Sequence, residues 1–384
     1  MFNRSIAPVD QAQLAEALKP FGQTKMLPVG SYLDEAVLEW ERVHIFGGWV
    51  ALGRVEDVQK PRQMKAYPAG EGGVLVARGD DGVLRGFENA CRHRGHELMV
   101  CDGQTPTETT SARTITCPYH AWSFRLDGSM IGAPGFKEAD GFNPGDYPLR
   151  SVEIREWHGW LFANRGTGSF EEHIRGLGDI LERYDGAELV TCESHTYYVE
   201  ANWKVIVENY QECYHCPSIH PELCVVSPPD SGLNVDPQGD WVGGAMNLRE
   251  GMATMSLDGV SGGTVMARLD EVEQRTVMYI ALLPNMLISL HPDYVMTHLL
   301  VPVSPGKTRI TCSWAFPAAV AAREGFDPSY AVDFWDITNR QDWAACESVQ
   351  RGMANPGYVP GPMAPREDGV FDFVNYVARK YSGE

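Results

Sequence analysis

Apolar residues follow two different spacings along the chain, and the change in spacing divides the sequence into three parts. Residues 10–41 hold two stretches with helical spacing, DQAQLAEALKPF and SYLDEAVLEWERVH, and Ser31 is a plausible N-cap for the second. From Trp49 to about Trp160 the apolar runs are short and are separated by Gly, Pro and Asp-Gly, which is typical of strands and tight turns. Hairpins are expected in GGVLVARGDDGVLRGFEN and SFRLDGSMIG, with a further strand in WHGWLFANR. The middle part is therefore predicted to be a small all-β module.

Helical spacing returns after Phe170. Helices are expected in FEEHIRGLGDILERY and ANWKVIVENYQECYHC, and the second must end near Pro217 because a residue before proline avoids the helical conformation. Strands are expected in RTVMYIALLPNMLISLHP, YVMTHLLVPV and TRITCSWAF. SYAVDFWDITNRQDWAACESVQRGM is predicted to form the longest helix, and FDFVNYVARKY a short one after a Pro/Gly-rich stretch.

Composition and charge narrow the class of protein. The 384 residues are enough for two domains, and 43% hydrophobic and 22% charged residues are ordinary for a globular chain. The net charge of −19 argues against nucleic acid and anionic membranes as partners. The start of the chain does not resemble a signal peptide, and the most apolar stretch, Ile280 to Leu290, is too short and interrupted to span a membrane.

Cysteine usage favours a cytoplasmic, reducing location. Nine cysteines are an odd number in a chain without an export signal, so metal-bound and free thiols are expected rather than a disulfide framework. Cys213-x-x-Cys216 is spaced like a redox or zinc pair, but no second pair of suitable spacing follows it. We interpret Cys213 and Cys216 as two packed thiols.

Two mixed pairs of metal-ligating residues stand in the β module, Cys91-Arg92-His93 and Cys117-Pro118-Tyr119-His120. Two thiolates on one iron and two imidazoles on the other are what a Rieske [2Fe–2S] cluster requires. A structural zinc site accepts the same ligands, but it usually joins Cys with Cys and His with His. The mixed pairs favour the cluster, with zinc as the alternative.

A second group of polar residues precedes Pro217. On a continuous helix, Glu208, Glu212 and His215 would fall within about 60° of one another. His220 follows five residues after His215, and Pro217 would let the chain turn it back toward the same point. Two imidazoles and a carboxylate form the facial triad of non-haem Fe(II) oxygenases.

The long helix near the C-terminus offers the carboxylate. Asp336 and Glu347 share a face with other polar side chains and fit a solvated, ion-paired surface. Asp342 instead lies on a mostly apolar stripe, where a carboxylate is costly unless it is paired or binds a metal. Asp342 is therefore the preferred third ligand.

These residues resemble a known family. Cys91-Arg92-His93-Arg94-Gly95 and Cys117-Pro118-Tyr119-His120-Ala121-Trp122 are similar to the Rieske motif of ring-hydroxylating oxygenase α subunits. Further runs resemble their catalytic domain: Asn202-Trp203-Lys204, Glu208-Asn209-Tyr210, Glu212-Cys213-Tyr214-His215, His220-Pro221-Glu222-Leu223, Gln341-Asp342 and Cys346-Glu347. The likeness covers nearly the whole chain. One departure is the 23-residue separation between His93 and Cys117, which we interpret as a surface-loop insertion at residues 105–113.

The resemblance implies an α+β protein with a small all-β Rieske domain at 42–160. It implies a catalytic domain at 161–384, in which a curved antiparallel sheet wraps a long helix, with the helical segment 1–41 packing on it. The implied ligands are Cys91, His93, Cys117 and His120 for the [2Fe–2S] cluster, and His215, His220 and Asp342 for a mononuclear Fe(II). Glu212 would link the cluster of one subunit to the iron of the next in a head-to-tail homotrimer, and Asn209 would lie beside the iron ligands.

The implied activity is that of a terminal oxygenase. The chain has no flavin or nicotinamide motif, so electrons are expected from a separate NAD(P)H-dependent flavin/iron–sulfur reductase. The run from Cys213 to Leu223 and that from Ser289 to Tyr294 resemble the branch that demethylates betaines such as glycine betaine and stachydrine. The alternatives are a hydroxylase or dioxygenase of an aromatic ring or aromatic acid, and a Rieske electron carrier without oxygenase activity. Candidates for an aromatic cage around a quaternary ammonium are Trp241, Tyr279, Tyr294, Trp314 and Phe316.

Overall fold

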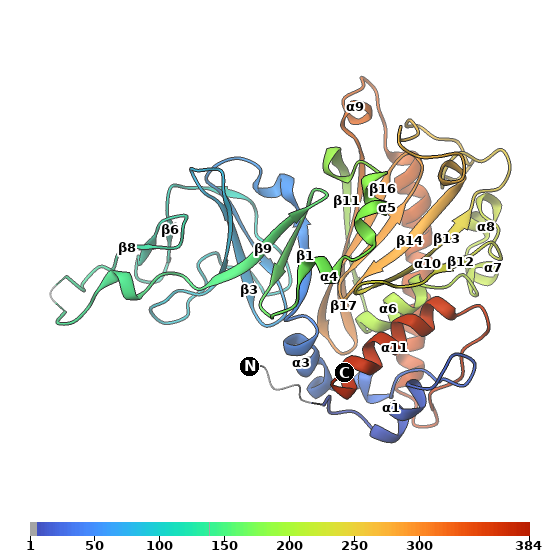
Figure 1. The fold of residues 1–384 in the computed structure, drawn as a ribbon, viewed down its shortest axis with the longest axis horizontal. Helices are drawn as coiled ribbons and strands as arrows, with labels where there is room; N and C mark the ends of the chain where they lie inside the picture. Colours follow the sequence, from blue (N-terminus) through green and yellow to red (C-terminus); the bar gives the residue numbers. More distant parts are fainter. Residues whose placement is uncertain (1–5, 138) are drawn as a thin grey trace. The chain divides into compact units, whose positions relative to one another are not determined.

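The computed structural model describes residues 6–137 and 139–384, which form two compact units (Figure 1). One unit is residues 46–168. The other joins the chain up to Ile45 with residues 169–384. The first helices therefore fold together with the C-terminal part of the chain, although the whole of the first unit lies between them in sequence.

The unit of residues 46–168 consists of antiparallel strands. In its described residues seven strands pair in the order β1-β10-β9-β4-β3-β2-β5 and three more in the order β6-β7-β8. Their bounds are β1 Trp49–Arg54, β2 Gln63–Pro68, β3 Gly73–Arg78, β4 Leu84–Glu88, β5 Thr110–Ser111, β6 Ile115–Thr116, β7 Ser123–Phe124, β8 Met130–Gly132, β9 Ser151–Trp157 and β10 Trp160–Asn164. The polar run at residues 105–113 is half-buried up to residue 107 and exposed after it. It is more than a loop, because Thr110 and Ser111 pair with β2 as an edge strand.

The second unit is built on a larger antiparallel sheet. Within its described part the strand order is β11-β17-β16-β15-β14-β13-β12. The bounds are β11 Leu189–Val199, β12 Leu233–Val235, β13 Trp241–Asn247, β14 Thr276–Leu282, β15 Met286–Leu290, β16 Val295–Ser304 and β17 Lys307–Pro317. Every residue of β15 is buried, as expected for a central strand that is covered on both faces.

Helices of the second unit come from both ends of the chain. Their bounds are α1 Gln11–Ala17, α2 Gly30–Leu33, α3 Glu35–His44, α4 Phe170–His173, α5 Leu177–Glu182, α6 Trp203–Tyr210, α7 Cys216–Ile219, α8 Pro221–Val226, α9 Ala318–Ala321, α10 Ser329–Met353 and α11 Asp368–Ser382. The long helix α10 lies along the sheet (Figure 1), where Asn339 contacts His298 of β16 at 3.1 Å. In residues 6–137 and 139–384 no helix is both long and apolar enough to cross a membrane.

Several expected helices are shorter than their patterns predict. The stretch beginning at Ser31 is divided at Asp34, whose extended backbone ends α2 and precedes α3, so Ser31 lies inside α2 and is no N-cap. The helix expected from Phe170 is divided at Gly176, which has a positive φ of 78°. By contrast, α10 spans the residues that its pattern predicts, because a 25-residue amphipathic run gives a strong signal.

A buried ion pair fixes the start of α6. Glu41 of α3 and Lys204 of α6 are both fully buried, and the Lys204 Nζ lies 2.6 Å from Glu41 Oε1. Trp203 donates its indole N–H to the other carboxylate oxygen at 2.8 Å, and the Tyr381 hydroxyl of α11 donates to Glu41 as well. The buried charges therefore compensate each other, and the carboxylate has further hydrogen bonds. This network joins α3, α6 and α11 at the start of the helix that leads into the site described below.

Lys204→Met should destabilise the second unit by about 3–5 kcal/mol, because it leaves a buried carboxylate without its cation. The matched control is Lys307→Met. The Lys307 Nζ also lies 2.6 Å from a carboxylate oxygen, that of Glu200, but the Lys307 and Glu200 side chains are 35% and 59% exposed. That change should cost less than about 1 kcal/mol. Thermal unfolding of both variants measures the difference, and equal losses of stability would contradict the role given to the buried pair.

Candidate metal centres

The first centre is formed where the chain leaves α6. The helix ends at Tyr210, earlier than its pattern predicts, and His215 is therefore not on it. The carboxylate of Glu212 accepts the backbone N–H groups of Tyr214 and His215, and these bonds replace continued helical bonds. His215 and His220 then flank the single-turn helix α7, so that Pro217 begins a new helix instead of ending the old one.

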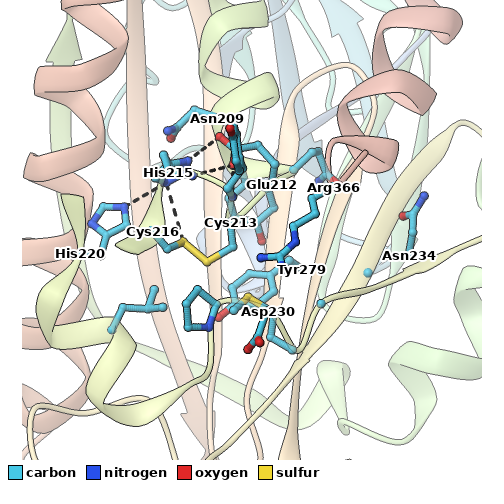
Figure 2. A pocket seen from close by; sticks show the side chains of 18 of the residues that line it. Asn209, Glu212, Cys213, His215, Cys216, His220, Asp230, Asn234, Tyr279 and Arg366 are labelled. Atoms are coloured by element: carbon cyan, nitrogen blue, oxygen red, sulfur yellow. Dashed lines mark hydrogen bonds and ion pairs between the residues drawn. A yellow bond between two sulfur atoms is a disulfide. The ribbon is translucent and has the colours of Figure 1, made fainter. Parts of the chain in front are cut away.

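Cys213 and Cys216 are joined by a disulfide, with their Cα atoms 4.9 Å apart. This separation lies within the range that a disulfide can bridge. The interpretation of these residues as packed free thiols is therefore wrong. The bond closes the short loop that carries His215, next to Glu212 (Figure 2).

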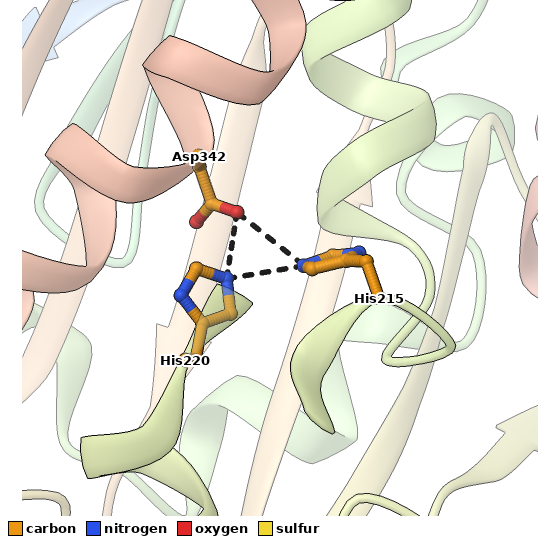
Figure 3. Close-up of side chains that lie close together, drawn as sticks. All are labelled: His215, His220 and Asp342. Atoms are coloured by element: carbon orange, nitrogen blue, oxygen red, sulfur yellow. Dashed lines mark hydrogen bonds and ion pairs between the residues drawn. The ribbon is translucent and has the colours of Figure 1, made fainter. Parts of the chain in front are cut away.

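His215, His220 and Asp342 converge on one point (Figure 3), and their ligand atoms all lie within 4.8 Å of one another. The two Nε2 atoms are 3.1 Å apart. Asp342 Oδ1 lies 2.8 Å from Nε2 of His220 and 3.4 Å from Nε2 of His215. Asp342 comes from the middle of α10, so the three side chains are brought together by two elements more than 100 residues apart.

Oxygen acceptors hold the outer nitrogen of each imidazole. His215 Nδ1 lies 2.5 Å from Glu212 Oε1, and His220 Nδ1 lies 2.7 Å from Gln341 Oε1. Because carboxylate and amide oxygens only accept, each Nδ1 carries the proton and each Nε2 presents a lone pair to the common point. Two facing lone pairs and a carboxylate are unfavourable without a cation between them. The set therefore fits a divalent metal, and carboxylate- or amide-held imidazoles are typical of metal ligands.

The electrostatics of the three residues lead to the same conclusion. Burial acts against a charge on His215, but the carboxylates of Asp342 and Glu212 outweigh it and raise the pKa of the imidazole to about 9. Burial also acts against ionisation of Asp342, yet its hydrogen bonds with the two imidazoles hold the pKa of that carboxyl below its usual range. The carboxylates that favour a proton on His215 also favour a metal cation at the same point.

A cavity of about 300 Å³ opens beside these residues, a size suited to a small ligand. His215, His220 and Asp342 line it together with Asn209 and Glu212. Figure 2 shows the two histidines, Asn209 and Glu212 around the cavity. Its aromatic lining includes Tyr210, Tyr214, Tyr279 and Trp335. Of the cage candidates taken from the sequence, Tyr279 alone lines it, since the other four are almost fully buried in the core: Trp241, Tyr294, Trp314 and Phe316.

The second centre lies in the unit of residues 46–168, where two loops have the same pattern of backbone hydrogen bonds. In one, Cys91 N–H bonds to His96 and the Cys91 carbonyl accepts from Gly95. In the other, Cys117 N–H bonds to Trp122 and its carbonyl accepts from Ala121. Gly95 and Ala121 occupy the same position in their loops, and both have positive φ, 74° and 57°. Each loop therefore turns in the same way after its Cys, although His93 follows Cys91 by two residues and His120 follows Cys117 by three.

The four candidate cluster ligands gather between these loops. Cys91 and Cys117 are buried free thiols, and their mutual contact helps to raise the pKa of Cys91, although burial is the larger cause. The rings of His93 and His120 lie 4.8 Å apart. His93 Nδ1 is buried, and it has no hydrogen-bond partner in the described residues. Paired thiols beside paired imidazoles, one with an unsatisfied buried nitrogen, fit a [2Fe–2S] cluster better than four unrelated side chains.

Comparisons with known proteins match one family model within each of the two units. The Rieske [2Fe-2S] domain matches residues 48–151, and the ring hydroxylating alpha subunit (catalytic domain) matches residues 187–383. The chain is 27% identical to the glycine betaine monooxygenase oxygenase subunit of Pseudomonas aeruginosa, over 97% of this chain and 93% of that protein. It is 26% identical to the carnitine monooxygenase oxygenase subunit of Escherichia coli, over 86% and 85%.

Among solved structures, the quaternary ammonium Rieske monooxygenase CntA in complex with L-carnitine superposes with a TM-score of 0.77. The match covers 96% of this chain and 97% of that one at 23% identity. At this level of identity the likeness concerns the fold. It agrees with the α+β class and with the curved antiparallel sheet and long helix expected from the sequence.

Asp342→Asn should remove the mononuclear metal and leave the cluster in place. We expect the purified wild type to hold about three iron atoms and two acid-labile sulfides per chain, and the variant about two of each. Metal analysis and sulfide titration measure both numbers, and the visible absorption of the cluster should not change.

The matched control is Asp336→Asn on the same helix. Asp336 accepts from the Tyr197 hydroxyl and pairs with Arg340, away from the two imidazoles. This variant should keep the wild-type iron content. An Asp342→Asn protein that retains all its iron would remove Asp342 from the ligand set.

Proposed function

This chain belongs to the family of ring-hydroxylating oxygenase alpha subunits, and we propose that it removes an N-methyl group from a betaine-type quaternary amine. Membership confirms the pair of cofactors expected from the sequence, a Rieske [2Fe–2S] cluster and a mononuclear iron. The observation that carries the proposal is the convergence of His215, His220 and Asp342 on the wall of a small cavity. A simple electron carrier has no use for such a site.

The lining of the cavity suits a cationic head group. Tyr210, Tyr279 and Trp335 offer aromatic faces, and the rings of Tyr210 and Tyr279 are 5.9 Å apart in an edge-to-face arrangement. Aromatic faces attract quaternary ammonium groups, and the carboxylates of Glu212 and Asp342 add negative potential nearby. The relatives named for glycine betaine and carnitine support the same substrate class.

We assign the ligands as the sequence predicts. Cys91, His93, Cys117 and His120 would hold the cluster. His215, His220 and Asp342 would hold the iron on one face, and when bound the iron supplies activation of O₂ for attack on a C–H bond. The remaining steps belong to the chain: Glu212 and Gln341 fix the two imidazoles, and the aromatic rings keep water from the reacting methyl group.

The overall reaction balances as a monooxygenation. The substrate methyl group, O₂, two electrons and two protons give a hydroxymethyl ammonium and water. The hydroxymethyl group then releases formaldehyde and a proton, and the tertiary amine remains. Because the cluster passes single electrons and the chain has no flavin or nicotinamide motif, we propose a separate NAD(P)H-dependent reductase in the cytoplasm.

Purified oxygenase supplied with O₂, NADH and a compatible reductase should release formaldehyde from a betaine, in proportion to the NADH consumed. The panel should contain glycine betaine, stachydrine and carnitine, with benzoate and naphthalene as aromatic substrates. Product from the aromatic compounds without formaldehyde from any betaine would favour the alternative, an aromatic hydroxylase or dioxygenase. Leaving out the reductase should abolish the product.

We propose that Glu212 also relays electrons between subunits of a head-to-tail homotrimer, with Asn209 beside the iron. Glu212→Gln keeps an acceptor oxygen for His215 Nδ1 but removes the negative charge. Product formation should fall by about 10–100-fold while iron and sulfide contents stay at the wild-type level. The protein should sediment as a trimer.

Two outcomes of this experiment would contradict the relay. Unchanged turnover would do so directly, and loss of iron in proportion to activity would show that Glu212 only holds His215 in place. The matched control is Glu271→Gln, an exposed glutamate that does not line the cavity. It should keep both iron and activity.

A further inference from the structure

One cationic side chain enters the cavity. Arg366 is the only Lys or Arg among the described residues that line it. Carboxylates line it as well: Glu212, Asp230, Asp342 and Asp368. Figure 2 shows the Arg366 side chain extending from its loop into the pocket. A guanidinium stays charged at any ordinary pH, so the cavity has a permanent positive group among negative ones.

The Arg366 guanidinium has no partner in the part of the chain that the structure describes. Within the described residues it makes no ion pair or hydrogen bond, although Asp230 and Asp368 line the same cavity. Two arginines elsewhere in the chain show what a paired guanidinium looks like: Arg165 binds Glu88 through three short contacts, and Arg340 binds Asp336 at 2.7 Å. The five N–H donors of Arg366 are therefore available to a ligand.

The backbone around Arg366 is held firmly. The Met26 N–H bonds to the Gly361 carbonyl and anchors the segment before Arg366. The Glu367 carboxylate accepts the Ala364 N–H, and this bond closes a turn around Arg366. The first turn of α11 approaches the end of α6 so closely that a side chain at Gly369 would come within 2.7 Å of the Gln211 carbonyl oxygen. Arg366 therefore projects from a fixed loop, near the point where the chain turns toward Glu212 and His215.

A second unsatisfied donor lines the same cavity. The Tyr279 hydroxyl oxygen is buried and has no hydrogen-bond partner in the described residues. Burial raises the pKa of Tyr279, so the hydroxyl keeps its proton and can donate it to an anion. An unpaired guanidinium and an unpaired hydroxyl are the groups that recognise a carboxylate, which accepts at both of its oxygens.

We propose that Arg366 binds the carboxylate of a zwitterionic substrate and so places its quaternary ammonium toward the iron ligands. The inference rests on the proposed function and adds the anionic end of the substrate to it. It predicts that the enzyme prefers betaines, which carry a carboxylate, over quaternary amines that carry a neutral group in its place. Arg366 is then the residue that determines this preference.

The test compares each betaine with its carboxamide, which has nearly the same shape but no negative charge. Glycine betaine, stachydrine and carnitine are each paired with the corresponding amide. Formaldehyde release gives kcat/KM, and calorimetry gives Kd for binding to the iron-loaded oxygenase without turnover. In Arg366→Gln, the ratio of betaine to amide should fall by about 10–100-fold in both kcat/KM and affinity.

Arg366→Lys keeps the charge but loses the fork of donors, and it should retain an intermediate preference. The matched control is Arg351→Gln, which removes the same charge from an exposed position outside the cavity and should keep the wild-type ratio. A circular dichroism spectrum and iron content equal to those of the wild type show that each variant is folded.

The outcomes separate the two proposals. If the wild type demethylates betaines and Arg366→Gln keeps the wild-type ratio, the role of Arg366 is refuted and the proposed function stands. The same holds if the wild type prefers the amides. If the wild type releases formaldehyde from none of these compounds, the proposed function fails, and the inference that rests on it fails too.

Discussion

The catalytic unit holds three hydrogen-bond acceptor atoms close together against their mutual repulsion. The Nε2 atoms of His215 and His220 lie 3.1 Å apart, and Oδ1 of Asp342 lies 2.8 Å from Nε2 of His220. Glu212 and Gln341 prevent either imidazole from turning away. Such an arrangement needs a positive charge, either a proton on an imidazole or a metal cation, and its nitrogen and oxygen ligands suit a divalent metal. The rest of the unit holds this arrangement in place: α10 supplies the carboxylate, the one-turn helix α7 separates the imidazoles, and the disulfide closes the loop before it.

Much of this could be predicted from the sequence, because its strongest signals are local. The amphipathic pattern of α10 gave its full length, and a carboxylate on an apolar stripe singled out Asp342. The mixed Cys/His pairs indicated a cluster because their residue types limit the chemistry. In each case a few neighbouring residues carry the information, and tertiary contacts do not override it.

The remaining features depend on contacts between distant residues. The helix α6 ends at Tyr210 because the Glu212 carboxylate accepts backbone N–H groups that the helix would otherwise use. The spacing of apolar residues contains no information about this hydrogen bonding. Aromatic residues on strands gave a poor guide to the cavity, since most of them fill the core. Arg366 lies in a Pro/Gly-rich segment without periodicity, and only the packing of α11 against the end of α6 brings it to the site. That none of the described residues pairs with Arg366 could not be predicted from the sequence.

The central claim is that one chain holds an electron-transferring cluster and, separately, a ferrous ion bound by nitrogen and oxygen ligands. Mössbauer spectroscopy of protein enriched in ⁵⁷Fe tests it most directly, because each iron site gives its own absorption. We expect about two-thirds of the iron in a cluster with two inequivalent sites and about one-third as mononuclear high-spin Fe(II). A spectrum in which all the iron belongs to the cluster, in fully loaded protein, would contradict the account.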